Sequence, residues 1–207
     1  MKIDKLSIDG KKQSIEVLDK IFSAKVNDQL VSGVIYKLNA NFKGRKAKTK
    51  QRNEITGSTS KIYSQKGTGN ARHSSKKAPI FVGGGIAHGP KGQDNYKNRK
   101  LNKSEKKMSI ASLITEKNKS KNVIIFDDFG KKIEKTKEMF EFLKKFDANN
   151  SLLILDTKSK DNILRSTKNI PNVKLTDANH FSAFDLVKYK KIIFTESSVK
   201  ELEKRYK

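Results

Sequence analysis

The chain has 207 residues, which is enough for one domain of ordinary size plus an insertion, and its formal net charge is +24. This excess of Lys and Arg favours a polyanionic partner, either nucleic acid or an anionic membrane surface. The absence of cysteine excludes a disulfide framework and a thiolate metal site, and no apolar run is long enough to span a membrane. Residues 1–10 lack the apolar core of a signal peptide, so we predict a cytoplasmic protein that binds nucleic acid.

Residues 1–42 are expected to form a hairpin followed by a helix. Apolar residues alternate on both sides of Asp9-Gly10, a favoured dipeptide for a tight turn between strands. The alternating residues are Leu6, Ile8, Ile15 and Val17. Asn27 can cap the helix, and Asp28 lies in its first turn. The helix carries apolar residues at three- and four-residue spacing, which we expect in the core: Leu30, Val31, Val34, Ile35, Leu38 and Phe42.

Residues 43–100, called the loop below, differ in composition from the rest of the chain. They contain nine of the 12 glycines and carry 15 Lys and Arg residues against two acidic ones, a net charge of +13. Only eight positions have a large apolar or aromatic side chain, too few to offset the entropy of ordering the backbone. We therefore expect the loop to be disordered in the isolated protein. An insertion this long is usually functional, although a flexible basic insertion without a specific partner is the alternative.

After residue 101 the pattern becomes regular. The run 102–105 (NKSE) resembles a capping box with Asn102 as the cap. The helix after it has an apolar face made of Met108, Ile110, Ala111, Leu113 and Ile114. Short apolar strands then alternate with helices; the predicted strands are residues 123–126, 152–155, 173–175 and 191–195, and the predicted helices are 138–146, 161–168, 182–189 and 198–206. In the first of these helices, Met139, Phe140, Leu143 and Phe146 are expected to face inward. The alternation predicts an α/β fold with a mostly parallel sheet and helices on both faces, a Rossmann-like topology.

No group of residues supports an enzyme. The run 84–89 (GGIAHG) has phosphate-loop spacing, but Pro90 stands where the lysine should be, and residues 67–69 (GTG) follow no strand. Asp127-Asp128 follows a strand without an evident partner, which is more typical of a helix cap or a solvated turn than of an acid–base pair. The three histidines are not brought together by their spacing, and no nucleophile elbow is present. We expect no catalytic residue, no cofactor and no metal site.

The loop, in contrast, has the residue types that bind RNA. Lys and Arg neutralise phosphates, and glycine allows a close approach of the backbone. Tyr63, Phe81 and Tyr96 can stack on unpaired bases or wedge between RNA helices. Alternatively, Tyr63 and Phe81 pack on each other at the loop tip.

Three runs of the loop closely resemble a known family: residues 65–72 (QKGTGNAR), 78–85 (APIFVGGG) and 89–91 (GPK). They are similar to the extended loop of the universal family of the fourth large-subunit ribosomal protein, in its bacterial form. The preceding helix, the run 101–108 (LNKSEKKM) and the α/β pattern also match, so the resemblance covers nearly the whole chain. It implies a globular domain on the outer side of the subunit and a loop threaded into its RNA. It further implies that the loop tip lines the narrow part of the nascent-peptide tunnel.

Together these features predict a globular domain of residues 1–42 and 101–207 and an extended RNA-binding loop of residues 43–100. The residues expected to bind RNA are Arg45, Lys46, Lys48, Lys50, Arg52, Lys61, Lys66, Arg72, Lys76, Lys77, Phe81, Lys91, Tyr96, Arg99 and Lys100. By their place in the family pattern, the residues expected at the tunnel-lining tip are Ile62, Tyr63, Ser64, Gln65, Lys66 and Gly67.

The expected function is that of a structural component of the large ribosomal subunit, which binds its RNA, aids assembly and lines the exit tunnel. The expected partners are large-subunit ribosomal RNA, neighbouring ribosomal proteins and the nascent peptide at the tunnel wall, with no membrane and no homo-oligomer. One alternative is translational repression, in which free copies bind the leader of their own messenger RNA. Another is an α/β enzyme with a basic appendage.

Overall fold

The computed structural model describes residues 1–7, 12–129, 133 and 135–206, which divide into two compact units. Met1–Asn39 and Lys100–Lys207 form the first unit, and Ala40–Arg99 form the second. The first unit contains the sheet and the helices that cover it. The second unit is mostly irregular backbone, with a single short 3-10 helix, η1 (Gly92–Asn95), among its described residues.

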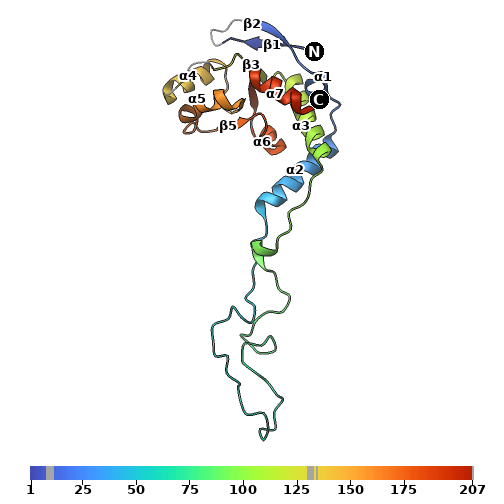
Figure 1. The fold of residues 1–207 in the computed structure, drawn as a ribbon, viewed down its shortest axis with the longest axis vertical. Helices are drawn as coiled ribbons and strands as arrows, with labels where there is room; N and C mark the ends of the chain where they lie inside the picture. The colour runs from blue at the N-terminus through green and yellow to red at the C-terminus, as the bar shows by residue number, and fades with distance from the viewer. Residues whose placement is uncertain (8–11, 130–132, 134, 207) are drawn as a thin grey trace. The chain divides into compact units, whose positions relative to one another are not determined.

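The first unit is built on a six-stranded sheet in the order β2-β1-β3-β6-β4-β5 (Figure 1). Its strands are β1 (Lys2–Leu6), β2 (Lys12–Glu16), β3 (Val123–Phe126), β4 (Ser151–Leu155), β5 (Val173–Asp177) and β6 (Lys191–Thr195). β1 pairs antiparallel with β2, and the other neighbouring strands pair in parallel. The predicted mostly parallel α/β sheet is therefore confirmed. The Asp9-Gly10 turn predicted between β1 and β2 lies outside the described residues.

Helices cover both faces of this sheet. They are α1 (Asp19–Phe22), α2 (Asp28–Lys43), α3 (Lys103–Lys119), α4 (Thr136–Lys145), α5 (Thr157–Thr167), α6 (Ala183–Lys188) and α7 (Glu196–Tyr206). Alternate residues of the central strands enter two separate apolar clusters, because successive side chains of a strand point to opposite faces. Along β4, Leu152 and Ile154 join one cluster with residues of α1, α2, α3, α6 and α7. Leu153 and Leu155 join the other, with residues of α4 and α5.

Three apolar residues predicted in the core are exposed instead. The exposed fractions are 91% for Phe42, 54% for Met108 and 46% for Phe140. In α4 the buried face is formed by Met139, Phe142 and Leu143, and Phe140 points about 100° away from Met139 around the helix axis. Met108 lies one residue before the stretch of α3 that is buried, and Phe42 lies in the last turn of α2, in the second unit.

The helix starts agree only in part with the prediction. The backbone N–H of Leu30 donates to Asn27 Oδ1 at 3.1 Å, which confirms the cap of α2. Asn102 is the N-cap residue of α3, as predicted, but its side chain makes no cap bond, so the capping box itself is wrong. The Glu105 carboxylate instead pairs with Lys37 at 3.2 Å and accepts a hydrogen bond from the Asn102 side-chain amide at 3.4 Å. α5 starts four residues before the prediction, since its first turn, Thr-Lys-Ser-Lys, has no apolar residue to reveal it.

Candidate nucleic-acid interface

The base of the loop is held by hydrogen bonds within the second unit. α2 ends where Gly44 adopts a φ of +59°, and its N–H donates to the carbonyl of Ala40 at 3.0 Å. This left-handed ending suits glycine, which lacks a Cβ. The Tyr96 hydroxyl donates to the same carbonyl at 2.9 Å, and the Asn41 amide exchanges two hydrogen bonds with the backbone of Arg99, at 2.9 and 2.7 Å. Tyr96, expected at the RNA interface, therefore has its hydroxyl bound to the backbone of α2.

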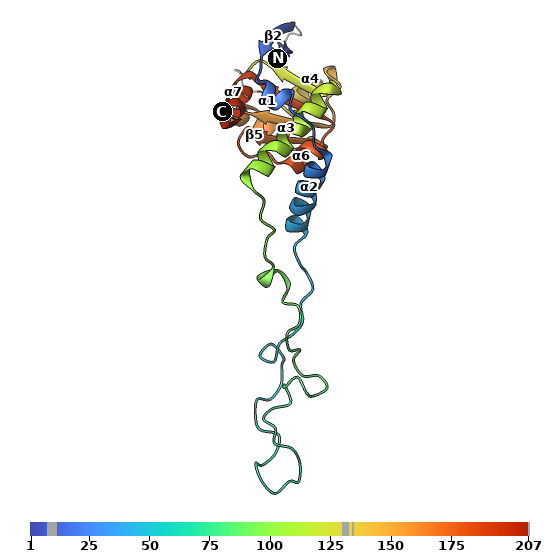
Figure 2. The ribbon, with the colours of Figure 1, turned by 90° about the vertical axis from the view of Figure 1, so that its right-hand side faces the viewer.

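Backbone hydrogen bonds join the outgoing and returning arms along the loop (Figure 2). They run from Gly92 N–H to Ala47 O (2.9 Å), Thr49 N–H to Pro90 O (2.8 Å), Ile86 N–H to Lys50 O (3.0 Å) and Ile62 N–H to Ser74 O (2.9 Å). Within the returning arm, Gly85 N–H donates to Lys77 O (3.0 Å). Lys48 and Lys91 form an isolated antiparallel bridge between the arms. The loop thus has a defined pairing of its two arms, while its disorder in the isolated protein stays a prediction.

Gly85 allows a close approach between the backbones of the two arms. A Cβ added to it would lie 2.3 Å from the backbone nitrogen of Arg52, far inside normal contact distance. Gly85 is buried and belongs to the run 84–89, which has phosphate-loop spacing. Its close contact is with the protein's own backbone, so this glycine serves packing of the loop.

The predicted cationic residues are almost all exposed. Of the 15 Lys and Arg residues in the loop, 14 are exposed and Lys77 is half-buried. Lys48 lies 3.4 Å from Glu54. A hydrogen bond from the backbone N–H of Gln51 lowers the pKa of Glu54 most, and a hydrogen bond from the Lys48 side chain lowers it further. This carboxylate is therefore negatively charged at neutral pH. Even with this pair, the surface of the loop remains strongly positive.

The aromatic residues near the tip are connected through a histidine. The His73 ring packs edge-on against Tyr63 and Phe81, with ring centroids 6.4 and 5.0 Å apart. The Tyr63 hydroxyl also donates to the carbonyl of Ala71. Sequence reasoning proposed either base stacking or direct packing of Tyr63 on Phe81, and it gave His73 no role. A histidine placed eight to ten residues from two aromatic residues carries no local signal of such packing.

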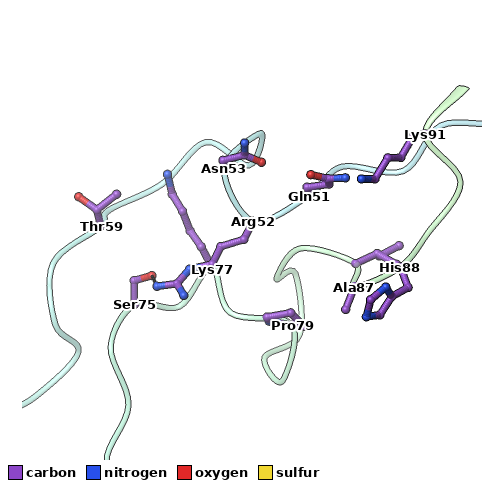
Figure 3. Close-up of a pocket in the computed structure, with 11 residues that line it drawn as sticks. Gln51, Arg52, Asn53, Thr59, Ser75, Lys77, Pro79, Ala87, His88 and Lys91 are labelled. Carbon is purple, nitrogen blue, oxygen red and sulfur yellow. Dashed lines mark hydrogen bonds between the residues drawn. The ribbon is translucent and has the colours of Figure 1, made fainter. Parts of the chain in front are cut away.

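An open hollow of about 720 Å³ lies between the two arms of the loop (Figure 3). Its lining residues come from segments 51–59 and 75–91 and include Arg52, Lys77 and Lys91. The hollow thus brings together three cations that the sequence placed only in one long loop.

The carboxylates at the C-terminal ends of the strands form structural contacts. Lys5 Nζ lies 2.7 Å from Asp127 and 2.9 Å from Glu196, and hydrogen bonds to Asp127 and then Glu196 raise the pKa of Lys5. Asp128 accepts a hydrogen bond from the backbone N–H of Ser197, in the first turn of α7, at 3.0 Å. The helix-cap interpretation of this pair is therefore confirmed for Asp128.

Among residues 1–7, 12–129, 133 and 135–206, no group of three or more His, Asp or Glu residues is arranged to hold a metal ion. Within the same part of the chain, no helix is both long and apolar enough to cross a membrane.

Comparison with known proteins shows similarity along almost the entire chain. Residues 15–205 match the profile of the ribosomal protein L4/L1 family. The chain is 74% identical over 206 residues to the large ribosomal subunit protein uL4 of Pelagibacter ubique, with 100% of both chains covered. It is 34% identical to the uL4 protein of Clostridium botulinum strain Okra, covering 99% of this chain and 98% of the relative. The uL4 protein of Halothermothrix orenii is 35% identical over 91% of this chain and 90% of its own length.

Proposed function

The chain belongs to the ribosomal protein L4/L1 family, and from this premise we propose that its loop binds and organises the RNA of the large ribosomal subunit. Membership makes the chain a structural protein of the bacterial large subunit, located in the cytoplasm within the ribosome, and not an enzyme. Its partners are therefore ribosomal RNA and other ribosomal proteins.

The observation that carries the proposal is the exposure of charge along the loop. Fourteen exposed cations in one segment give a surface that RNA phosphates can neutralise with release of their counterions. Phosphate contacts of this kind supply most of the affinity and position a protein on its RNA. The pairing of the arms uses backbone hydrogen bonds, so it does not itself occupy the lysine and arginine side chains.

The tip of the loop is proposed to line the nascent-peptide tunnel and to narrow it. Ser64, Gln65, Lys66 and Gly67 are exposed, while Ile62 and Tyr63 are half-buried and provide bulk without charge. Uncharged bulk is suited to a tunnel wall, and Lys66 can hold neighbouring phosphates. This assignment depends on the resemblance of residues 65–72 to the family pattern.

A long basic loop also suits a role in subunit assembly. Segments that order on binding can cover a large RNA surface, and they bring separate RNA elements together as they do so. We propose that the loop acts in this way, joining RNA segments along both of its arms.

A crosslinking map of ribosomes tests these proposals. A photoreactive residue in place of Arg72 should crosslink to large-subunit RNA in purified subunits. One in place of Lys66 should crosslink to nascent peptides in ribosomes stalled during translation. The same residue at Lys137, on the exposed face of α4, is the comparison outside the loop. If position 72 gives no RNA crosslink in subunits that contain the protein, the proposed RNA interface is wrong; if only position 66 fails, the placement of the tip is wrong.

A further inference from the structure

The hollow between the arms has the size of a small-molecule site. Its volume is about 720 Å³, within the range of roughly 300–1,000 Å³ typical of ligand pockets. A single nucleotide, with its base, ribose and phosphate, is a ligand of that class. The two arms border the space, and beside it Gly85 lets the returning arm approach the backbone of Arg52.

One wall of the hollow is cationic, and a hydrogen bond holds the guanidinium of its arginine, Arg52. Arg52 Nη2 lies 3.5 Å from the hydroxyl of Ser75, a residue only 2% exposed. An arginine has five N–H donors, so this bond leaves others for a ligand. Lys77 lies on the same side of the hollow as Arg52, whereas Lys91 lines the opposite side, beside Gln51 (Figure 3). None of the described residues around the hollow is a carboxylate. This wall is suited to a phosphate.

The other wall offers flat and apolar surface. Ile86 lines the hollow, and so do Pro79 and the ring of His88, which are labelled in Figure 3. His88 adopts a φ of +57°, a left-handed conformation that is uncommon for residues other than glycine. Such a conformation costs free energy and is concentrated at binding sites, where surrounding structure maintains it. An imidazole ring beside aliphatic side chains is a surface on which a base can stack.

From this combination we propose that the hollow receives one unpaired nucleotide of the large-subunit RNA. Its phosphate lies against Arg52 and Lys77, and its base packs against Ile86 and His88. A base within a duplex is stacked and paired, whereas bases in loops and bulges can be splayed out and inserted between side chains. The proposal rests on the proposed function, and it adds a defined site for a single extruded base to what would otherwise be a surface for phosphates.

Chemical probing of RNA in assembled subunits tests this site. Two hollow variants are compared with the wild type: His88→Gly, which removes the ring and suits the left-handed backbone, and Arg52→Ala with Lys77→Ala, which removes two charges. The matched control is Arg72→Ala with Lys76→Ala, which removes two loop charges that do not line the hollow. Base-specific reagents report whether a base is covered, and hydroxyl-radical cleavage reports the footprint of the loop on the RNA backbone.

We expect one unpaired base to be protected in wild-type subunits and to gain the reactivity of a free unpaired base in both hollow variants. The control variant should leave that base protected, and His88→Gly should leave the backbone footprint unchanged. If the footprint persists but no base responds to the hollow variants more than to the control, the nucleotide site is wrong while the RNA-binding function stands. If wild-type subunits show no footprint from the loop, both proposals fail.

Discussion

The salt dependence of RNA binding is the most direct measure of how many loop cations contact phosphates. We consider a variant in which four exposed loop residues become alanine: Lys46, Lys50, Arg72 and Lys76. Each phosphate contact contributes roughly 0.7–0.9 to the slope of log K against log salt concentration. If all four contact phosphates, the slope should become less steep by roughly 3. Because the four side chains are exposed, the free energy of unfolding should change by no more than about 0.5 kcal/mol for each substitution.

The measurement is the affinity of the full-length protein for large-subunit RNA over a series of potassium chloride concentrations. A matched control removes four exposed lysines from the first unit: Lys137, Lys144, Lys145 and Lys168. Both variants lose the same net charge, so a difference between their slopes reports contact and not overall attraction. The reasoning is refuted if the loop variant keeps the wild-type slope, or if the control variant loses as much as the loop variant does.

Three other predictions concern the tip, the packing of the arms and the first unit. Tyr63→Ala and Lys66→Glu should leave the thermal midpoint of unfolding unchanged. Each should alter nascent-chain pausing or the sensitivity of ribosomes to tunnel-binding antibiotics. If both variants assemble and show normal pausing and normal sensitivity, these residues are not at the constriction. Gly85→Ala places a Cβ only 2.3 Å from the backbone nitrogen of Arg52, so the two arms of the loop must move apart. This substitution should weaken RNA binding, measured by RNA titration, without changing the unfolding of the sheet, measured by thermal denaturation. Hydrogen bonds from Lys200 and then Lys5 hold the pKa of Glu196 below its ordinary value of 4.5. The stability that the Glu196 carboxylate contributes is therefore present above pH 4.5 and is lost as pH falls through the folded-state pKa. Urea denaturation at a series of pH values should therefore show Glu196→Gln less stable than the wild type at neutral pH, with a difference that shrinks in acid; a difference independent of pH would contradict the assignment.

Much of the fold was accessible from local patterns in the sequence. The strands β3 and β6 were predicted at their observed bounds, because apolar runs of this length, rich in β-branched residues and bounded by polar ones, are too short for a helix and typical of buried strands. The cap at Asn27 was also predicted, since an asparagine ahead of an apolar helical stripe acts within one turn. The net charge of the loop follows from composition alone, and so does the expectation of a polyanionic partner.

Errors arose where a residue's surroundings lie far away in the chain. Phe140 is a different case, because the three- and four-residue spacing of Met139, Phe142 and Leu143 already places Phe142, and not Phe140, on the buried face of α4. Glu105 fits a capping box by sequence, yet its carboxylate is engaged by Lys37, a residue 68 positions away. Local spacing cannot reveal a competing partner of this kind.

The sequence by itself determined the α/β class, the helical and strand periodicities and the basic character of the loop, since each depends on residues within a few positions of one another. The tertiary structure alone decided the strand order β2-β1-β3-β6-β4-β5, the packing of Tyr63 and Phe81 on His73, and the hollow around Arg52. These features join residues that are distant in the chain. Their energies depend on which surfaces meet after folding, and residue type and spacing leave that choice open.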